Sequence, residues 1–259
     1  IRRPPRSTQG VSSAASVVYK RQQYNTRVGT NAGDSFDGTN AASNTLIGYN
    51  SGTAITTGDN NTVVGSGGLI ANTTGSDNTV VGMNAADANT TGIQNTVVGS
   101  SALSANTTAH NNTAIGKNAL LLNTTGTENT AVGTSSGDAI TTGNYNTSMG
   151  VNSLTAATTS SYNTCFGKSA GSVITTGHSN TVVGGEAGRM TTGSYNVSIG
   201  YQSGGPQTGS NSVAIGWGSL YSATSGGNNT SVGKYAMRLL TTGANNTALG
   251  VEALDACVT

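Results

Sequence analysis

The sequence has little of what an ordinary enzyme domain is built from. Charged residues make up 8% of the 259 residues and aromatic residues 5%, whereas typical soluble proteins have about 25% charged residues. There are three prolines and two cysteines, and two cysteines are too few for a disulfide scaffold. The sequence also lacks the run of about 18 apolar residues that a membrane span requires. This composition excludes a thick hydrophobic core and predicts no membrane span in this segment.

Charge of one sign is also scarce over most of the chain. Six of the eleven basic residues lie within the first 27 positions, so the remainder carries five basic residues and all ten acidic ones. Nucleic-acid binding needs a basic surface that contacts the phosphates. We therefore expect no nucleic-acid partner for the body of the chain.

Residues 1–22 differ in composition from the rest. The pieces IRRPPRST and VYKRQ resemble translated library-adapter sequence, so we expect a non-native, disordered leader. The alternative is a basic arm or a transit peptide, which would be rich in Arg and Ser in the same way. The last residues, VEALDACVT, stop inside a repeat. We expect residues 23–259 to form a single repeat domain that is incomplete at both ends.

What the sequence does contain is glycine, asparagine and threonine in a fixed order. The pattern N-T-x-[V/I]-G recurs fourteen times, mostly 17 residues apart, and a T-T-G marker follows about ten residues after most copies. Seventeen residues are too few for a helical hairpin or a propeller blade and suit one coil of a β-solenoid. The pattern predicts an all-β, parallel β-solenoid of about fourteen coils. Stacked asparagines before each strand are expected to hydrogen-bond along the axis.

The last two positions of each predicted strand should face opposite sides of the coil. The position before the closing glycine is apolar in every copy, so we expect it to point into the interior. The position before that one would then point outward, where a continuous stripe of small apolar residues indicates an interface between chains. This candidate oligomer interface comprises Val63, Val80, Val97, Ala114, Ala131, Val182, Ala214 and Ala248.

The copy N-S-V-A-I-G at 211–216 resembles the head repeat of bacterial trimeric autotransporter adhesins. The other copies, with N-T-[AV]-[VI]-G and T-T-G, resemble repeats of phage tail fibres and related surface fibres. The resemblance covers residues 25–259, although adhesin heads have shorter coils. It implies a left-handed β-roll that forms a homotrimer and projects from a surface to bind a host or a matrix.

Motifs for chemistry are weak. Two G-x-S-x-G matches, at 133–137 and 167–171, fall in one column of the repeat, whereas a hydrolase nucleophile needs a strand–turn–helix context. His110 and His178 are four repeats apart, about 19 Å at the spacing of stacked strands, which is too far to share a metal. We expect no catalytic residues, no cofactor and no metal.

Two features remain as candidates for binding. The first is a set of aromatic side chains that could contact a sugar or a protein, namely Tyr145, Tyr162, Tyr195 and Trp217. The second is a row of threonines in the strands, including Thr62, Thr79 and Thr96, which resembles the arrays of β-solenoid ice-binding proteins. By alternation, however, this row would share its face with the valines expected in the core.

The sequence therefore predicts a non-enzymatic surface-fibre segment, a rigid shaft or head of the adhesin or tail-fibre kind. Repeated weak contacts would give attachment by avidity. Expected partners are further copies of the chain in a homotrimer and a host-surface protein or glycan receptor. The expected location is extracellular, on a cell surface or a virion appendage. The alternative is an ice-binding solenoid that uses its threonine rows.

Overall fold

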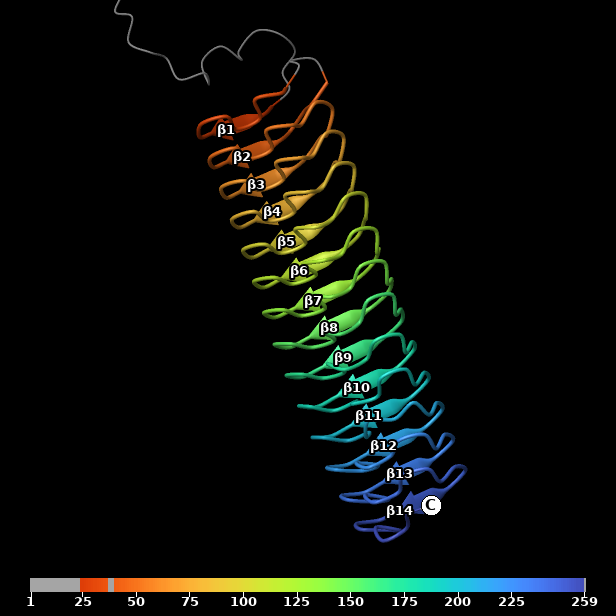
Figure 1. Ribbon diagram of the computed structural model, residues 1–259. Helices are drawn as coiled ribbons and strands as arrows, with labels where there is room; N and C mark the ends of the chain where they lie inside the picture. The colour runs from red at the N-terminus through yellow and green to blue at the C-terminus, as the bar shows by residue number, and fades with distance from the viewer. Residues whose placement is uncertain (1–23, 37–39, 259) are drawn as a thin grey trace, which may run out of the picture.

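Fourteen three-residue strands form one parallel sheet in which each strand pairs with the next along the chain. The computed structural model describes residues 24–36 and 40–258, and the leader expected at 1–22 lies outside these residues. Figure 1 shows the strands stacked in order from β1 to β14, with the connecting segments closing each coil. In the described part of the chain there is no helix. The predicted parallel β-solenoid is confirmed, with strands about 17 residues apart and about thirteen turns.

The strands are β1 Thr26–Val28, β2 Thr45–Ile47, β3 Thr62–Val64, β4 Thr79–Val81, β5 Thr96–Val98, β6 Thr113–Ile115, β7 Thr130–Val132, β8 Thr147–Met149, β9 Thr164–Phe166, β10 Thr181–Val183, β11 Val197–Ile199, β12 Val213–Ile215, β13 Thr230–Val232 and β14 Thr247–Leu249.

The register places equivalent residues of successive repeats on top of one another. Thr62 pairs with Thr79 and Thr79 with Thr96, and the valines that follow pair in the same way. Stacked strands are about 4.8 Å apart, so each residue type forms a column along the rod. Every position of the repeat is therefore one column of the surface or of the interior.

The closing glycine of each strand is required by its backbone. Gly99 has a φ of +143°, and a Cβ there would overlap the carbonyl oxygen of Gly116 in the next coil. Residues with a side chain rarely adopt this φ, and the stacked backbone leaves no space for one. The glycine column is thus a condition for stacking the coils.

The core lies on the side of the sheet opposite to the one that the sequence predicted. The middle residue of the strand is buried in β2 to β14, whereas Arg27 of β1 is half-buried; the residue before the closing glycine faces outward, as at Val81 (37% exposed) beside Val80 (0%). The predicted oligomer interface is therefore wrong, because its residues fill the interior of the coil. These residues are Val63, Val80, Val97, Ala114, Ala131, Val182, Ala214 and Ala248.

The reason for the inversion is the narrowness of the interior. Most coils add a larger side chain from the segment after the strand, such as Leu103, Leu120 or Leu154, and these are fully buried. Beside these side chains the middle of the strand holds only Val, Ala, Ser or Cys from β3 onward. The column before the glycine holds Met149 and Phe166, which the thin interior cannot accommodate at every level.

A ladder of buried asparagines runs beside the strands. Asn78 donates its backbone N–H to Oδ1 of Asn61 (3.1 Å), and its Nδ2 donates to the carbonyl of Gly92 in the T-T-G turn (3.0 Å). The same bonds recur in neighbouring coils, for example from Asn95 to Asn78 and to the carbonyl of Ala109. The predicted ladder is confirmed, and it fixes the strand of one coil to the coil before it and to its own T-T-G turn.

Candidate interaction surfaces

The residues that could suggest catalysis lie at corners of the coil. Ser135 and Ser169, the central residues of the two G-x-S-x-G matches, have φ values of 52° and 56° in equivalent turns. His110 accepts a hydrogen bond from the backbone N–H of Ile93 (3.3 Å), and His178 contacts the ring of Tyr195. No group of three or more potential metal ligands occurs within residues 24–36 and 40–258. The serines and histidines of these motifs are therefore turn residues of the repeat.

Among the residues that the structure describes, two groups have shifted pKa values. Burial raises the pKa of the Cys165 thiol to about 12. Desolvation by burial also raises the pKa of Asp138, against the effect of a hydrogen bond with Ser135. Perturbed pKa values can mark functional sites when partners converge on them. Cys165 belongs to the core column and Asp138 to a turn, so both shifts follow from position in the coil.

The outer sheet face, defined here as the first and third residues of the strands, is a regular array. Thr62, Thr79 and Thr96 are exposed; they share their face with the third residues of the strands, as alternation predicted, but that face points outward and not into the core. Beside them runs an apolar column that is half-buried at Val132, Met149, Ile215 and Val232. Eight of its residues are 37–39% exposed, namely Ile47, Val64, Val81, Val98, Ile115, Phe166, Val183 and Ile199. Threonine and apolar columns therefore share the exposed face of a single continuous sheet.

The three tyrosines predicted as contact residues lie in the turn that precedes the strand. Tyr145 and Tyr162 stack on each other, with ring centroids 4.9 Å apart and planes at 13°. Tyr195 lies edge-on to His178, with centroids 5.0 Å apart. A shallow hollow of about 340 Å³ lies among Tyr162, His178 and Tyr195. The tyrosines thus form a polar, aromatic edge on one side of the sheet.

Trp217 lies at the other end of its strand, directly after the closing Gly216. Its ring centroid is 5.0 Å from that of Tyr235, and Nζ of Lys234 is 4.9 Å from its centroid. The structure therefore divides the four predicted contact residues into two sites, because the turn before the strand and the corner after it lie on opposite edges of the sheet.

Around Trp217 the structure adds residues that the sequence analysis did not single out. The Trp217 groove is a shallow hollow of about 220 Å³ lined by Gln202, Trp217, Gly218, Tyr221, Tyr235 and Arg238. It adjoins a second hollow of about 370 Å³, to which Glu186, Arg189, Gln202 and Tyr221 contribute. One signal could have revealed it: Arg189, Lys234 and Arg238 are three of the five basic residues beyond position 27.

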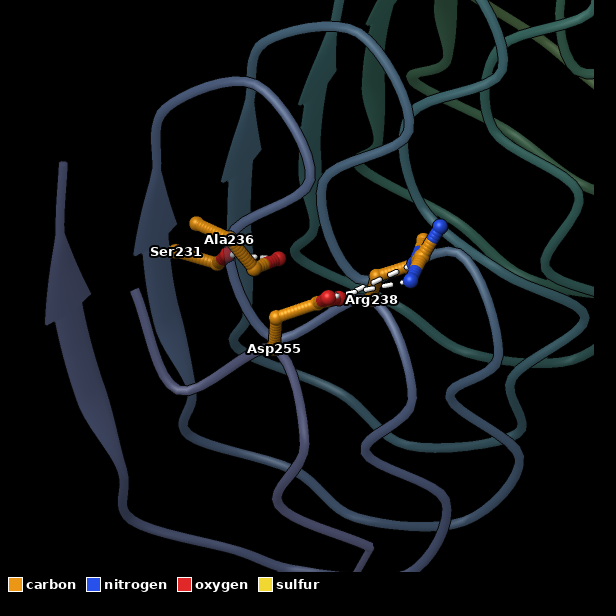
Figure 2. Close-up of polar contacts among 4 residues, drawn as sticks. All are labelled: Ser231, Ala236, Arg238 and Asp255. Carbon is orange, nitrogen blue, oxygen red and sulfur yellow. Dashed lines mark hydrogen bonds and ion pairs between the residues drawn. The ribbon is translucent and has the colours of Figure 1, made fainter. Parts of the chain in front are cut away.

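The polar groups of the Trp217 groove are held by acidic neighbours. Arg238 makes two hydrogen bonds of 2.9 Å with the carboxylate of Asp255 in the next coil, and Figure 2 shows the two side chains facing each other. The guanidinium also lies 4.9 Å from the centroid of the Tyr235 ring. Nε2 of Gln202 donates to Glu186 (2.9 Å). These contacts restrain an amide and a guanidinium beside aromatic rings.

Over the described ranges, no helix is long and apolar enough to cross a membrane. Comparison with protein-family models, with curated proteins and with solved structures finds no match to the chain. Function is therefore inferred from the surfaces described above.

Proposed function

We propose that the chain is a segment of a non-enzymatic surface fibre, a rigid shaft or head that mediates multivalent attachment. The observation that carries this proposal is the outer sheet face, where an apolar column is exposed in register from coil to coil. Long exposed apolar stripes mark interaction surfaces. A rod that repeats one surface at every coil suits binding by avidity.

In this proposal the outer sheet faces of three chains meet along the fibre axis. The number three follows the resemblance to adhesin heads, whereas the face follows the exposure of Val64, Val81 and Val98. Packing this column between chains removes apolar area from water, which stabilises the assembly by about 25 cal/mol for each Å² buried. The fibre would be displayed outside a cell or on a virion, with a host protein or glycan as receptor.

Sedimentation equilibrium tests the assembly. The wild-type chain is expected to be a trimer at micromolar concentration. The double variant Val81→Lys/Val98→Lys is expected to be a monomer with an unchanged circular dichroism spectrum, because lysine on this face adds charge to the interface but not to the core. A matched control, Thr57→Lys/Thr74→Lys, changes exposed positions of the T-T-G turns and should leave the trimer intact. A wild-type chain that stays monomeric contradicts the proposal.

A second function, ice binding, is favoured by one specific observation. Thr62, Thr79 and Thr96 are exposed in register on the same face as the valines, at the regular spacing of about 4.8 Å between strands. The two functions compete for one surface, because a trimer would cover it. An ice-recrystallisation assay with wild type and Thr79→Lys/Thr96→Lys separates them. Inhibition by a monomer that the double substitution abolishes supports ice binding, and a trimer without inhibition excludes it.

A further inference from the structure

We propose that the Trp217 groove binds a neutral oligosaccharide. This inference rests on the proposed attachment function and names the class of ligand at one site. The groove lies at the corner that follows the strands, outside the outer sheet face, so a trimer built on that face leaves it accessible. Nearly half of the Trp217 side chain (47%) and 36% of Tyr221 are exposed.

The groove exists because small residues interrupt its columns. Gly218 stands where equivalent coils have Asn84, Asn118 or Asn152. A Cβ at Gly218 would lie 2.6 Å from Cδ1 of Tyr235, so this glycine lets the Tyr235 ring lie against the backbone of the coil before it. The aromatic ring is thereby fixed along the wall of the groove.

A second interruption joins the two hollows. The backbone of Arg189 bonds to Gly204, and that of Gly205 bonds to Leu220, so two glycines lie between the coils of Arg189 and Tyr221. Because they carry no side chain, the Arg189 guanidinium reaches across an intervening coil to within 5.5 Å of the Tyr221 ring centroid. Gln202 and Tyr221 line both hollows, which makes one groove that runs along the axis.

The lining matches the chemistry of a sugar. The C–H face of a pyranose ring is apolar and packs on exposed aromatic surface, which Trp217 and Tyr221 offer here, with Tyr235 as the wall beside them. Sugar hydroxyls need a few fixed donors and acceptors at the edge of such a platform. Gln202, bonded to Glu186, and Arg238, bonded to Asp255, are restrained in that position. The joined groove spans the corners after β10, β11, β12 and β13, about 14 Å along the axis, which suits a short oligosaccharide.

The charges around the groove favour a neutral ligand. The three cations are Arg189, Lys234 and Arg238, and the coils that flank them supply the carboxylates Glu186, Glu252 and Asp255. The one ion pair among the described residues joins Arg238 to Asp255. Both signs are equally represented, so neither an acidic nor a basic ligand gains from the field of the site.

The single tryptophan of the chain makes the groove directly observable. Titration with cellohexaose, mannohexaose and N-acetylchitohexaose, followed by tryptophan fluorescence, is expected to give a saturable change with at least one probe, with dissociation constants of roughly millimolar size. Oligogalacturonate serves as the acidic comparison. Binding to the acidic probe alone, or to none of the four, overturns the inference.

Variants taken from the chain's own columns test the site without disturbing the fold. Tyr221→Ser copies Ser104 and Ser172, and Tyr235→Asn copies Asn118 and keeps a residue that tolerates the positive φ. Each is expected to weaken binding about 3- to 10-fold, the size of one aromatic contact, as measured by isothermal titration calorimetry. The control Tyr145→Asn/Tyr162→Asn removes the stacked pair at the opposite edge and should bind like wild type.

These experiments distinguish failure of the saccharide site from failure of the proposed fibre. A chain that forms trimers but binds none of the neutral probes loses this inference and keeps the fibre. A monomer whose binding is weakened by Tyr221→Ser and Tyr235→Asn keeps the saccharide site and loses the trimer. Equal binding by wild type and both groove variants would place the sugar elsewhere and overturn the site.

Discussion

Val80 and Val81 are neighbours in β4, yet Val80 is completely buried and 37% of the side chain of Val81 is exposed. The same relationship holds from coil to coil: the middle residue of the strand lies in the core, and the third lies on the outer sheet face. Two chemically identical residues therefore have opposite roles, one in folding and one at the surface.

This relationship predicts opposite effects of the same substitution. Val80→Lys buries an unpaired charge in a thin interior and is expected to unfold the coils around it, since such burial costs several kcal/mol. In the unassembled chain, at a concentration too low for chains to associate, Val81→Lys is expected to change the free energy of unfolding by about 0.5 kcal/mol or less, as for most surface positions. Urea denaturation followed by circular dichroism compares the two. Equal destabilisation would contradict the assignment of the faces.

The asparagine ladder predicts a graded series at Asn112. Its Oδ1 accepts from the backbone N–H of Asn129 (3.0 Å), and its Nδ2 donates to the carbonyl of Gly126 (3.0 Å). Asn112→Ala leaves both buried groups without these partners, and each such loss costs about 1–3 kcal/mol. Asn112→Ser is expected to cost about half as much, because a serine hydroxyl can replace the acceptor.

Ser212 shows that this replacement occurs within the chain. Its Oγ accepts from the N–H of Asn229 (3.2 Å), and serine has no amide to reach Gly226, the turn residue equivalent to Gly126. Ser212→Asn is therefore expected to stabilise the fold by about 0.5–1.5 kcal/mol, the net value of one hydrogen bond. Thermal unfolding measures the series, and equal losses for Asn112→Ala and Asn112→Ser would contradict the role of Oδ1.

The buried side-chain amide of Gln207 is a position where we expect a substitution to stabilise the fold. Its side chain is 1% exposed, and both its Nε2 and its Oε1 lack a hydrogen-bond partner within the described ranges. A buried polar group without a partner costs about 1–3 kcal/mol. Gln207→Met keeps a similar length and removes the polar atoms, so the free energy of unfolding should rise by about that amount. Thr208→Met, at the exposed neighbouring position, is the control, and a lower melting temperature for Gln207→Met contradicts the prediction.

The features that could be predicted from the sequence are those that recur at one fixed position of the repeat. The period, the parallel stacking and the asparagine ladder were predictable because each repeats at a fixed position. Which of the two faces of the strand points into the core was not predictable in the same way. Both Val80 and Val81 are apolar, and alternation says only that they face opposite sides. The serines at 148, 198 and 231 in the middle column were misleading, since they suggest exposure although they are buried.

The Trp217 groove was only partly predictable for a different reason. Trp217 was identified as a contact residue, but Gln202, Tyr221 and Arg238 come from three coils, and Gln202 stands at another position of the repeat than Tyr221 and Arg238, which share one. They meet because Gly205 and Gly218 leave space between coils. An aligned repeat shows columns, whereas this site depends on side chains that cross from one coil to another.

Cys165 gives a prediction that depends on pH. Burial raises the pKa of its thiol from 9.0 to about 12, and the thiolate is the reactive form. In the variant Cys257→Ala, iodoacetamide should alkylate native Cys165 at pH 8 at least about a thousandfold more slowly than in urea, because burial both keeps the thiol protonated and shields it from the reagent. In the unfolded chain the Cys165 thiol loses its proton at a lower pH than in the folded chain. The free energy of unfolding therefore falls as the pH rises above about 9. Equal native and urea rates at pH 8 would mean that the middle column opens to solvent. The variant Cys165→Ala, which copies Ala114 and Ala131, identifies the signal of Cys257.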